Sequence, residues 1–249
     1  MPRVTWIGHG TVLVDLDGVR LLTDPLLRNR VAHLQRRVPP PDAEAVRDLD
    51  AVLISHLHRD HLDLPSLRRV PRDPTLVVPR GAGRMLLRRG FTSVREVAPG
   101  DEVTIGSVTV QVTEALHHGG RGAFGASGPA LGFVFEGTRR IYHAGDTDLF
   151  DGMREIGATG LDLALVPIWG WGPRLGPGHL NPLRAAEALV MLHPRRAVPI
   201  HWGTYAVGPA ARRPQAYLSA PLAPFVAAAR ELAPDVEVVP LAPGESIEL

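Results

Sequence analysis

Short apolar runs separated by Gly, Asp and Pro recur along the whole sequence and restrict the folds that it can adopt. In the first half, five of these runs have the length and composition of β-strands, at residues 4–7, 11–16, 19–22, 51–54 and 76–78. The pair Asp17-Gly18 separates the second run from the third and predicts a tight hairpin turn. The N-terminal part is therefore expected to begin an antiparallel sheet.

The rest of the chain adds both strands and helices. Further strands are predicted at residues 94–97, 102–105, 108–114, 131–136, 139–143, 161–166, 197–200 and 236–239. Helical spacing predicts helices at 81–89, where Gly90 follows as a left-handed cap, and at 182–192 and 222–232. Strands with helices in both halves predict an α+β fold in which two sheets pack face to face and helices cover them.

Three Gly-, Pro- and Arg-rich stretches are predicted to be long loops, at residues 28–41, 169–178 and 203–214. Loops of this length in a compact domain are often lids or binding loops. The 249 residues allow one large domain or two small ones, and they suffice to bury roughly 70 to 75% of the unfolded surface. None of the three stretches has the character of a linker between domains.

The sequence contains no cysteine, which excludes disulfides, thiolate zinc sites, iron-sulfur clusters and a cysteine nucleophile. Any metal must therefore bind through nitrogen and oxygen. The 11 histidines provide such ligands, because imidazole is the usual ligand when thiolates are missing. All 27 basic residues are Arg, so a Schiff base or a P-loop lysine is excluded as well.

The charge and the apolar runs bear on partners and location. A net charge of +1 argues against a nucleic-acid groove, which needs a concentrated positive face. No apolar run approaches the roughly 18 residues of a membrane span, and the N-terminus lacks the residue order of a signal peptide. We therefore expect a cytoplasmic protein without a nucleic-acid partner.

Histidines and carboxylates concentrate directly after the strand predicted at 51–54. The segment reads Ser55-His56-Leu57-His58-Arg59-Asp60-His61-Leu62-Asp63. In an extended or tightly turned segment His56 and His58 can point to one side, while Asp60 and His61 reach a second point nearby. This arrangement suits two metal ions. Asp63 precedes Leu64-Pro65, where it fits a helix N-cap at least as well as a metal ligand.

At these residues the sequence resembles the metallo-β-lactamase fold superfamily, whose motif H-x-H-x-D-H is matched by His56, His58, Asp60 and His61. The resemblance implies a four-layer αββα sandwich, and a single domain over residues 1–249. It also implies further ligands: His117 for the first metal, Asp146 as the aspartate that bridges both metals, and His201 as the last histidine. Asp60 is given a catalytic role as well.

A finer resemblance is to the branch of the L-ascorbate-6-phosphate lactonases and the N-acyl-phosphatidylethanolamine phospholipase D-like enzymes. It rests on five short stretches: Trp6-Ile7-Gly8-His9, Thr23-Asp24-Pro25, Ala144-Gly145-Asp146-Thr147, His179-Leu180-Asn181-Pro182 and Ile200-His201-Trp202-Gly203.

Other polar residues have two interpretations each. His117 is preferred to its neighbour His118 as the ligand, which leaves His118 in the pocket or on the surface. His179 can touch substrate or protonate a leaving group, or it can be a capping or packing residue. His9 supports the metal site or is an ordinary buried histidine, and Asp24 orients a metal-bound imidazole or belongs to a turn. Structural roles are expected for three others: His33, His143 and His193.

Aromatic side chains follow the same strands. Trp169, Trp171, Trp202 and Tyr205 either line a pocket or close the end of the sandwich. Arg121 and Arg174 are candidates for binding a phosphate or carboxylate.

The resemblance and the ligand types predict hydrolysis. Two divalent ions sharing Asp146 would lower the pKa of a bridging water from about 15.7 toward about 7 and so supply hydroxide. Zinc fits these ligands, and Mn or Fe is compatible. The expected substrate is a small phosphorylated ester, lactone or phosphodiester, and the long loops leave a homo-oligomer open. The alternatives are a mononuclear iron enzyme similar to persulfide dioxygenases, and a non-catalytic metal-binding scaffold.

Overall fold

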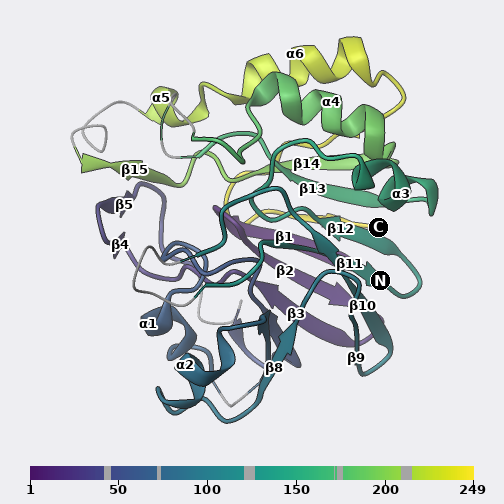
Figure 1. The fold of residues 1–249 in the computed structure, drawn as a ribbon. Helices are drawn as coiled ribbons and strands as arrows, with labels where there is room; N and C mark the ends of the chain where they lie inside the picture. The colour runs from purple at the N-terminus through teal and green to yellow at the C-terminus, as the bar shows by residue number, and fades with distance from the viewer. Residues whose placement is uncertain (42–45, 72–73, 121–126, 171, 173–175, 209–214) are drawn as a thin grey trace.

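Two β-sheets packed face to face form the centre of the computed structural model (Figure 1). The structure describes residues 1–41, 46–71, 74–120, 127–170, 172, 176–208 and 215–249. The first sheet has the spatial order β17 (Ser246–Glu248), β1 (Arg3–Gly8), β2 (Thr11–Leu16), β3 (Val19–Thr23), β6 (Ala51–Leu53), β7 (Thr75–Pro79) and β8 (Val94–Val97). The second has the order β16 (Glu237–Val238), β14 (Arg196–Ile200), β13 (Leu163–Pro167), β12 (Arg140–His143), β11 (Leu131–Glu136), β10 (Val108–Glu114) and β9 (Glu102–Ile105).

Each sheet changes from antiparallel to parallel pairing along its width. Strands β1, β2 and β3 are antiparallel, whereas β3, β6, β7 and β8 are parallel. In the second sheet β9 to β12 are antiparallel, and β12, β13, β14 and β16 are parallel. The carboxyl ends of parallel strands meet at one edge, which is where ligand sites form in such sheets.

The hairpin between β2 and β3 has the predicted turn. Asp17 (φ 52°) and Gly18 (φ 83°) both adopt left-handed conformations, as the turn of a two-residue hairpin requires. Alternation along β2 then separates two faces: Val12, Val14 and Leu16 enter the core between the sheets, and Leu13 enters a second core on the outer face.

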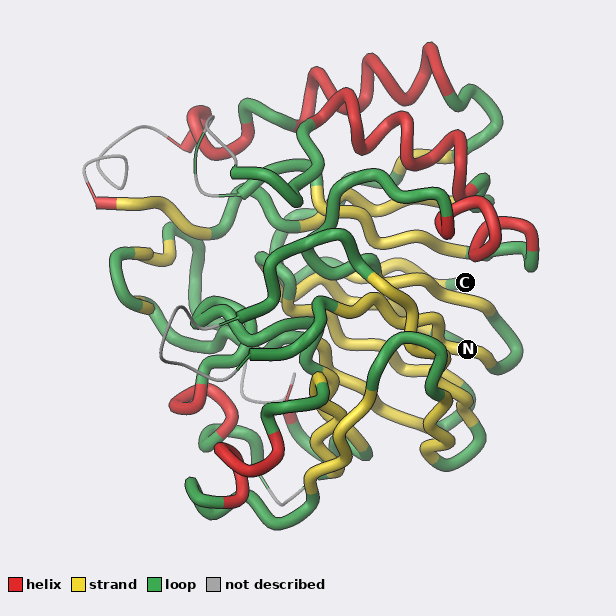
Figure 2. Tube along the Cα trace, viewed as in Figure 1, coloured by secondary structure: helices red, strands yellow, loops and turns green. Residues whose placement is uncertain are grey.

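Helices cover both outer faces, so that the molecule has four layers (Figures 1 and 2). Helices α4 (Pro182–Leu192) and α6 (Leu222–Leu232) pack over the second sheet, together with α3 (Gly152–Ala158). Helices α1 (Leu64–Leu67) and α2 (Gly83–Leu87) cover the first sheet, and α5 (Gln215–Ser219) precedes α6. This confirms the predicted αββα sandwich. Within the described part of the chain, no helix is both long and apolar enough to cross a bilayer.

Helices α4 and α1 each begin after a capping residue that can be recognised in the sequence. The Asn181 side chain accepts a hydrogen bond from the Arg184 backbone N–H at 3.0 Å, and Pro182 follows as the first helical residue. Asp63 caps α1 in the same way, because its side chain accepts a hydrogen bond from the Ser66 N–H. The expected capping role of Asp63 is therefore confirmed.

Two segments predicted as loops contain strands instead. A small sheet of β15 (Tyr205–Val207), β5 (Leu34–Arg36) and β4 (Arg30–Val31) forms within residues 28–41 and 203–214. These strands have two or three residues, too few for a periodic pattern, and the pairing of β15 with β5 joins distant parts of the chain. Helix α2 is also shorter than the predicted 81–89, although Gly90 has the expected left-handed φ of 89°.

A substitution at Phe133 can measure how much the packing between the sheets contributes to stability. Its side chain is 0% exposed in the main core, and we expect Phe133→Ala to lower the free energy of unfolding by about 3 to 5 kcal/mol through the cavity it leaves. Leu183→Ala is the control, because Leu183 is 54% exposed and its removal should change the value by less than about 0.5 kcal/mol. Urea unfolding of both variants measures the difference, and equal losses would contradict this packing.

Candidate metal centre

The predicted ligands lie on loops that follow strands at one edge of the sandwich. The loop after β6 carries the motif from His56 to His61, and the segment after β10 carries His117. Asp146 follows β12, and His201 directly follows β14. Since β12 and β14 are parallel to the strand between them, both loops leave the sheet at the same edge. The fold thus gathers ligands from four distant segments.

His56, His58 and His117 form a first group. Nε2 of His56 lies 3.0 Å from Nδ1 of His58, which lies 3.2 Å from Nε2 of His117. Ligand nitrogens of a tetrahedral zinc ion, at about 2.0 to 2.1 Å from the metal, are roughly 3.3 Å apart. The spacing of these three nitrogens therefore suits a bound metal ion.

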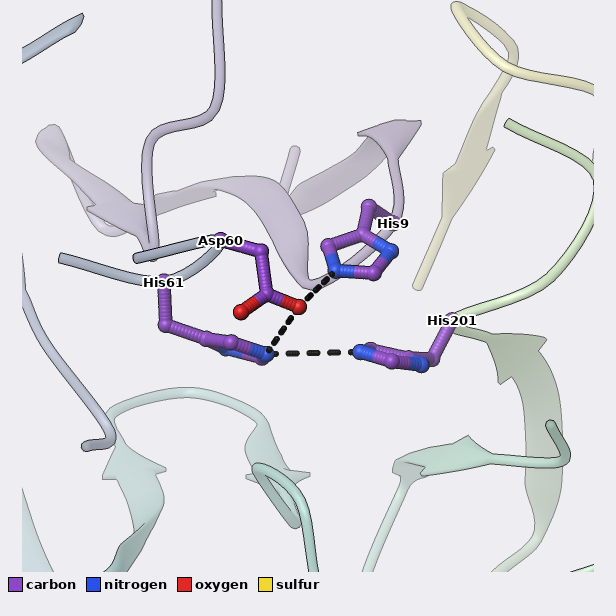
Figure 3. A group of neighbouring side chains, drawn as sticks. All are labelled: His9, Asp60, His61 and His201. Carbon is purple, nitrogen blue, oxygen red and sulfur yellow. Dashed lines mark hydrogen bonds and ion pairs between the residues drawn. The ribbon is translucent and has the colours of Figure 1, made fainter. Parts of the chain in front are cut away.

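A second group consists of His9, Asp60, His61 and His201, whose polar atoms point toward one another (Figure 3). Nε2 atoms of His61 and His201 are 3.3 Å apart, and Nε2 of His61 is 3.8 Å from Oδ2 of Asp60. His9 reaches the same carboxylate oxygen through its Nε2 at 3.0 Å. Three imidazoles and a carboxylate thus surround a second point, and His9 contacts the same carboxylate oxygen that faces His61.

Asp146 lies between the two groups. Its Oδ1 is 3.2 Å from Nε2 of His201, and its Oδ2 is 3.4 Å from Nε2 of His61 and 4.0 Å from Nε2 of His56. The side chain is buried, so these contacts form away from bulk water. A carboxylate in this position can contact ions in both groups.

Hydrogen bonds on the outer side of the rings orient three of the histidines. Nδ1 of His117 donates to the Gly178 carbonyl at 2.8 Å, and Nδ1 of His201 donates to the Trp169 carbonyl at 2.9 Å. Nδ1 of His61 is 2.8 Å from Oδ2 of Asp24. A carbonyl can only accept, so in His117 and His201 the proton is on Nδ1 and the lone pair of Nε2 faces the centre. This is the arrangement that metal-bound imidazoles require.

Ser55 is part of this network, although sequence reasoning did not single it out. Its hydroxyl donates to Oδ2 of Asp24 at 2.5 Å, and its backbone N–H donates to Oδ1 at 2.7 Å. The same hydroxyl is 3.0 Å from Nδ1 of His56. Its position directly before the histidine motif was the available signal. No sequence signal points to the Gly178 and Trp169 carbonyls, because every residue type has a backbone carbonyl.

Burial keeps several of the imidazoles neutral. Desolvation lowers the pKa of His117 to about 4 and that of His201 to about 3, against the nearby charge of Asp146, which acts in the opposite direction. Burial also lowers the pKa of His56 and His58. Neutral imidazole is the form that binds metals, so these residues need lose no proton at neutral pH.

Asp146 and His61 are instead held in their charged forms, because the pKa of Asp146 is lowered and that of His61 is raised. Burial opposes the charge of Asp146, but the neighbouring His201 and His61 hold the pKa of this carboxyl well below its usual range. His61 is likewise buried, yet the carboxylates of Asp146 and Asp24 raise its pKa well above the ordinary value. Without a cation, His61 therefore carries the proton that balances this negative charge.

Three residues at the site have left-handed backbones: His9 (φ 56°), Asp24 (φ 38°) and His201 (φ 64°). Such conformations are uncommon for residues with a side chain, and they concentrate at functional sites. Before Asp146, Gly145 has a φ of 62°, and a Cβ added there would lie 2.6 Å from the Leu131 carbonyl. Only glycine fits at this turn.

The remaining site candidates surround these groups. His179 is half-buried, with Nε2 3.6 Å from Oδ2 of Asp146, whereas His118 is exposed. The Tyr205 ring stands edge-on to His9 at 5.6 Å, and Trp169 packs against Tyr217. Trp171, Arg121 and Arg174 lie outside the described residues.

His143, predicted to be structural, joins the two sheets. It is fully buried, its Nε2 donates to the Gly10 carbonyl at 3.1 Å, and its Nδ1 accepts from the Gly145 N–H at 3.2 Å. Both ring nitrogens are thus occupied. His193 ends α4 with a left-handed φ of 43°.

Two sheets between helical layers, with groups of histidine and aspartate at one edge, define the metallo-β-lactamase fold. A sequence model of the beta-lactamase superfamily domain matches residues 19–202, and the chain belongs to this superfamily.

Similarity to individual proteins agrees with this assignment. The chain is 34% identical to the N-acyl-phosphatidylethanolamine-hydrolyzing phospholipase D 1 of Caenorhabditis elegans over 82% of its own length and 64% of that protein. It is 32% identical to a UPF0173 metal-dependent hydrolase of Rubrobacter xylanophilus, over 98% of the chain and 96% of that protein. The first curated relatives it matches are longer, and the chain spans 60 to 64% of their length.

Among solved structures, the metallo hydrolase Igni18 from Ignicoccus hospitalis superposes with a TM-score of 0.73 at 24% identity, over 99% of this chain and 97% of that one. At this identity the likeness supports the fold alone.

We expect the metal-free protein to lose stability as the pH falls from about 6.5 to about 4. In this interval His117 and His201 remain neutral in the folded protein but take up protons in the unfolded chain, so acid favours unfolding. Each contributes a slope of at most about 1.4 kcal/mol per pH unit. His61 does not change this slope. Its pKa is raised in the folded protein, so below the pKa of the unfolded chain it is protonated in both states, and its contribution to the free energy of unfolding stays constant in this interval.

Urea unfolding of chelator-treated protein across this interval measures the slope. His117→Ala should make the slope shallower, and an unchanged slope in that variant would contradict the assigned burial of His117.

Proposed function

We propose that this protein is a metal-dependent hydrolase that uses two divalent ions to cleave a small phosphorylated ester, lactone or phosphodiester. The observation that carries the proposal is the position of Asp146, whose oxygens face His201 and His61 on one side and His56 on the other. A carboxylate shared between two groups of imidazoles is suited to a site with two metals. The relatives named as metal-dependent hydrolases support this assignment.

We assign the ions to particular residues. His56, His58, His117 and Asp146 would hold the first ion, and Asp60, His61, Asp146 and His201 the second. Zinc is the preferred metal for a site of imidazole and carboxylate, and Mn or Fe is compatible with the same ligands. When bound, such ions lower the pKa of a water molecule and polarise a carbonyl or phosphoryl oxygen.

His9 and Asp24 act through the ligands that they contact. The hydrogen bond from His9 fixes the carboxylate of Asp60, and Asp24 fixes the ring of His61 while two bonds from Ser55 hold Asp24 in place. Outer contacts of this kind typically change metal affinity by about 10 to 100-fold. Both residues are therefore assigned as positioning residues.

His179 is the residue to which we assign protonation of the leaving group, and Asp60 the orientation of the attacking water. The half-buried ring of His179 is 4.6 Å from the ring of His117, centroid to centroid, and its Nδ1 is 3.1 Å from the Gly176 carbonyl. That contact directs Nε2 toward Asp146, at 3.6 Å. A proton donor at this side of the site can meet an oxygen leaving group.

Among the three bond types, the phosphodiester has support from sequence similarity. The Caenorhabditis elegans relative is named for hydrolysis of a phosphodiester lipid, and it shares 34% identity over 82% of this chain. We further propose that residues 1–249 form one domain. The cytoplasmic location, the possible homo-oligomer and the lack of a nucleic-acid partner stay predictions from the sequence.

We expect His58→Ala and Asp146→Ala to abolish turnover while the fold remains. The purified wild type should contain two metal ions per chain, whereas His58→Ala should retain at most one, because it lacks a ligand of the first group. Metal analysis and turnover of bis(4-nitrophenyl) phosphate, a lactone and a phosphomonoester measure both properties. His33→Ala is the control, since His33 is exposed on the small sheet. Full activity of Asp146→Ala would rule out the proposed mechanism.

We expect His179→Gln to lower kcat by about 10² to 10⁴-fold without loss of metal, because glutamine keeps hydrogen bonding but cannot donate a catalytic proton. The alkaline limb of the pH profile of kcat should disappear at the same time. A substrate with a good leaving group needs no protonation and should recover most of the rate. A uniform loss on all substrates, with an intact pH profile, would instead indicate a structural role.

A further inference from the structure

A hollow with a volume of about 350 Å³ opens beside the loop at residues 55–63, which carries His56, His58, Asp60 and His61 and is called the metal-binding loop below. Volumes of this order suit small-molecule ligands. None of the metal-ligand candidates lines it. Its walls come from the segment after β3, from the outer side of the metal-binding loop, and from α1 and α2 with Arg89 beyond: Arg28, Val31, Ala32, Arg59, Leu62, Asp63, Leu64, Pro65, Met85 and Arg89.

The lining combines apolar side chains with basic groups. Ala32 and Pro65 are exposed and Met85 is half-buried, so these three side chains offer apolar surface to the hollow. Arg59 and Arg89 are exposed, and Arg28 is half-buried. Three of ten lining residues are Arg, a larger share than the 27 of 249 in the whole sequence. The concentration therefore exceeds what composition alone predicts.

Asp63 is the single carboxylate among the described residues that line the hollow, and it already has partners. Asp63 receives two hydrogen bonds from the Arg28 guanidinium, at 2.8 and 2.7 Å, and also caps α1. With the described residues, Arg59 and Arg89 form no ion pair. Among the described residues, no carboxylate therefore balances these two positive charges at the rim of the hollow.

A neighbouring hollow extends this positive surface. It is lined by Gly81, Arg84, Met85, Arg88 and Arg89, and therefore shares Met85 and Arg89 with the first. Like charges that lie close together repel one another and so destabilise the folded protein, and a bound anion reduces that repulsion. The charge of the region accordingly selects for a negatively charged ligand.

We propose that the first hollow is a binding site for a small amphiphilic anion. Its phosphate, sulfonate or carboxylate group would bind between Arg59 and Arg89, and its apolar body would cover Ala32, Pro65 and Met85. Guanidinium groups bind such oxyanions with charge-assisted hydrogen bonds, while removal of the apolar body from water adds affinity. The site is separate from the metal centre and does not depend on the proposed hydrolase activity.

The ligand would touch the loop that carries the metal ligands. Arg59 stands between His58 and Asp60 in the sequence, and Leu62 follows His61. An anion held by Arg59 would therefore contact this loop next to the candidate metal ligands, through a residue that is not one of them.

A fluorescence titration of the full chain with 8-anilinonaphthalene-1-sulfonate, an anion with an aromatic body, tests the proposal. We expect saturable binding of one molecule per chain, weakened at least about tenfold in the double variant Arg59→Glu with Arg89→Glu. The matched control reverses two exposed arginines on distant helices, Arg154→Glu with Arg230→Glu, and should leave the affinity unchanged. Equal affinities in all three proteins would overturn the proposal.

Two further arms separate the apolar and the basic half of the site. Octyl phosphate should displace the probe far more effectively than inorganic phosphate, and the uncharged substitution Met85→Ser should weaken octyl phosphate binding without changing that of inorganic phosphate. Equal competition by the two phosphates would overturn the amphiphilic part of the proposal.

Vesicles with and without anionic lipid test whether the same arginines serve a membrane surface. Binding only to anionic vesicles, lost equally in Arg84→Glu with Arg88→Glu, and no binding of the soluble probe would overturn the small-ligand site. Unfolding midpoints of every variant confirm that each one is folded.

Discussion

Three buried carboxylates at one edge of the sandwich are the constraint on which the rest of the structure depends. Asp24, Asp60 and Asp146 are 0%, 6% and 4% exposed, and an ionised carboxylate removed from water costs several kcal/mol unless partners replace its hydration. Each one has partners: Ser55 and His61 for Asp24, His9 for Asp60, and His61 with His201 for Asp146. These histidines therefore compensate the buried carboxylates in the folded protein, and in the proposed metal-bound form the cation would take over the charge balance that the proton on His61 supplies without it.

The sheets provide the positions for these groups through strand direction. Antiparallel strands would send successive loops to opposite edges, whereas β3 and β6 in one sheet, and β12, β13 and β14 in the other, all end at the same edge. Left-handed residues then turn the chain sharply after the strands. His201, the first residue after β14 of the second sheet, therefore contacts the loop after β1 of the first sheet: its N–H donates to the His9 carbonyl at 3.1 Å. Backbone strain at His9 and His201 is offset by the packing of the sandwich around them.

Local signals account for the parts of this structure that the sequence predicts. The hairpin at Asp17-Gly18 and the start of α4 at Asn181-Pro182 depend on residues adjacent in sequence, and both are predicted correctly. Strands β4, β5 and β15 depend on pairing between distant segments and have too few residues for periodicity, so they were missed. The same distinction applies to the candidate site. The histidine motif after β6 can be recognised from the sequence. The Gly178 and Trp169 carbonyls that orient His117 and His201 cannot, because only the folded chain brings these backbone groups near the histidines.

The metal-binding loop also has two sides with opposite requirements. His56, His58 and His61 face the polar centre, whereas Leu57 and Leu62 are buried in the apolar core beneath α1 and α2. The loop is therefore fixed from both directions: hydrogen bonds hold the ligands, and the leucines hold the backbone between them. A change in the packing of Leu57 or Leu62 would displace the histidines by the same movement, because each leucine is adjacent to a ligand. Arg59 lies within the same loop but is exposed, so the loop that is fixed by its buried residues also presents a positive charge to the hollow beside α1 and α2.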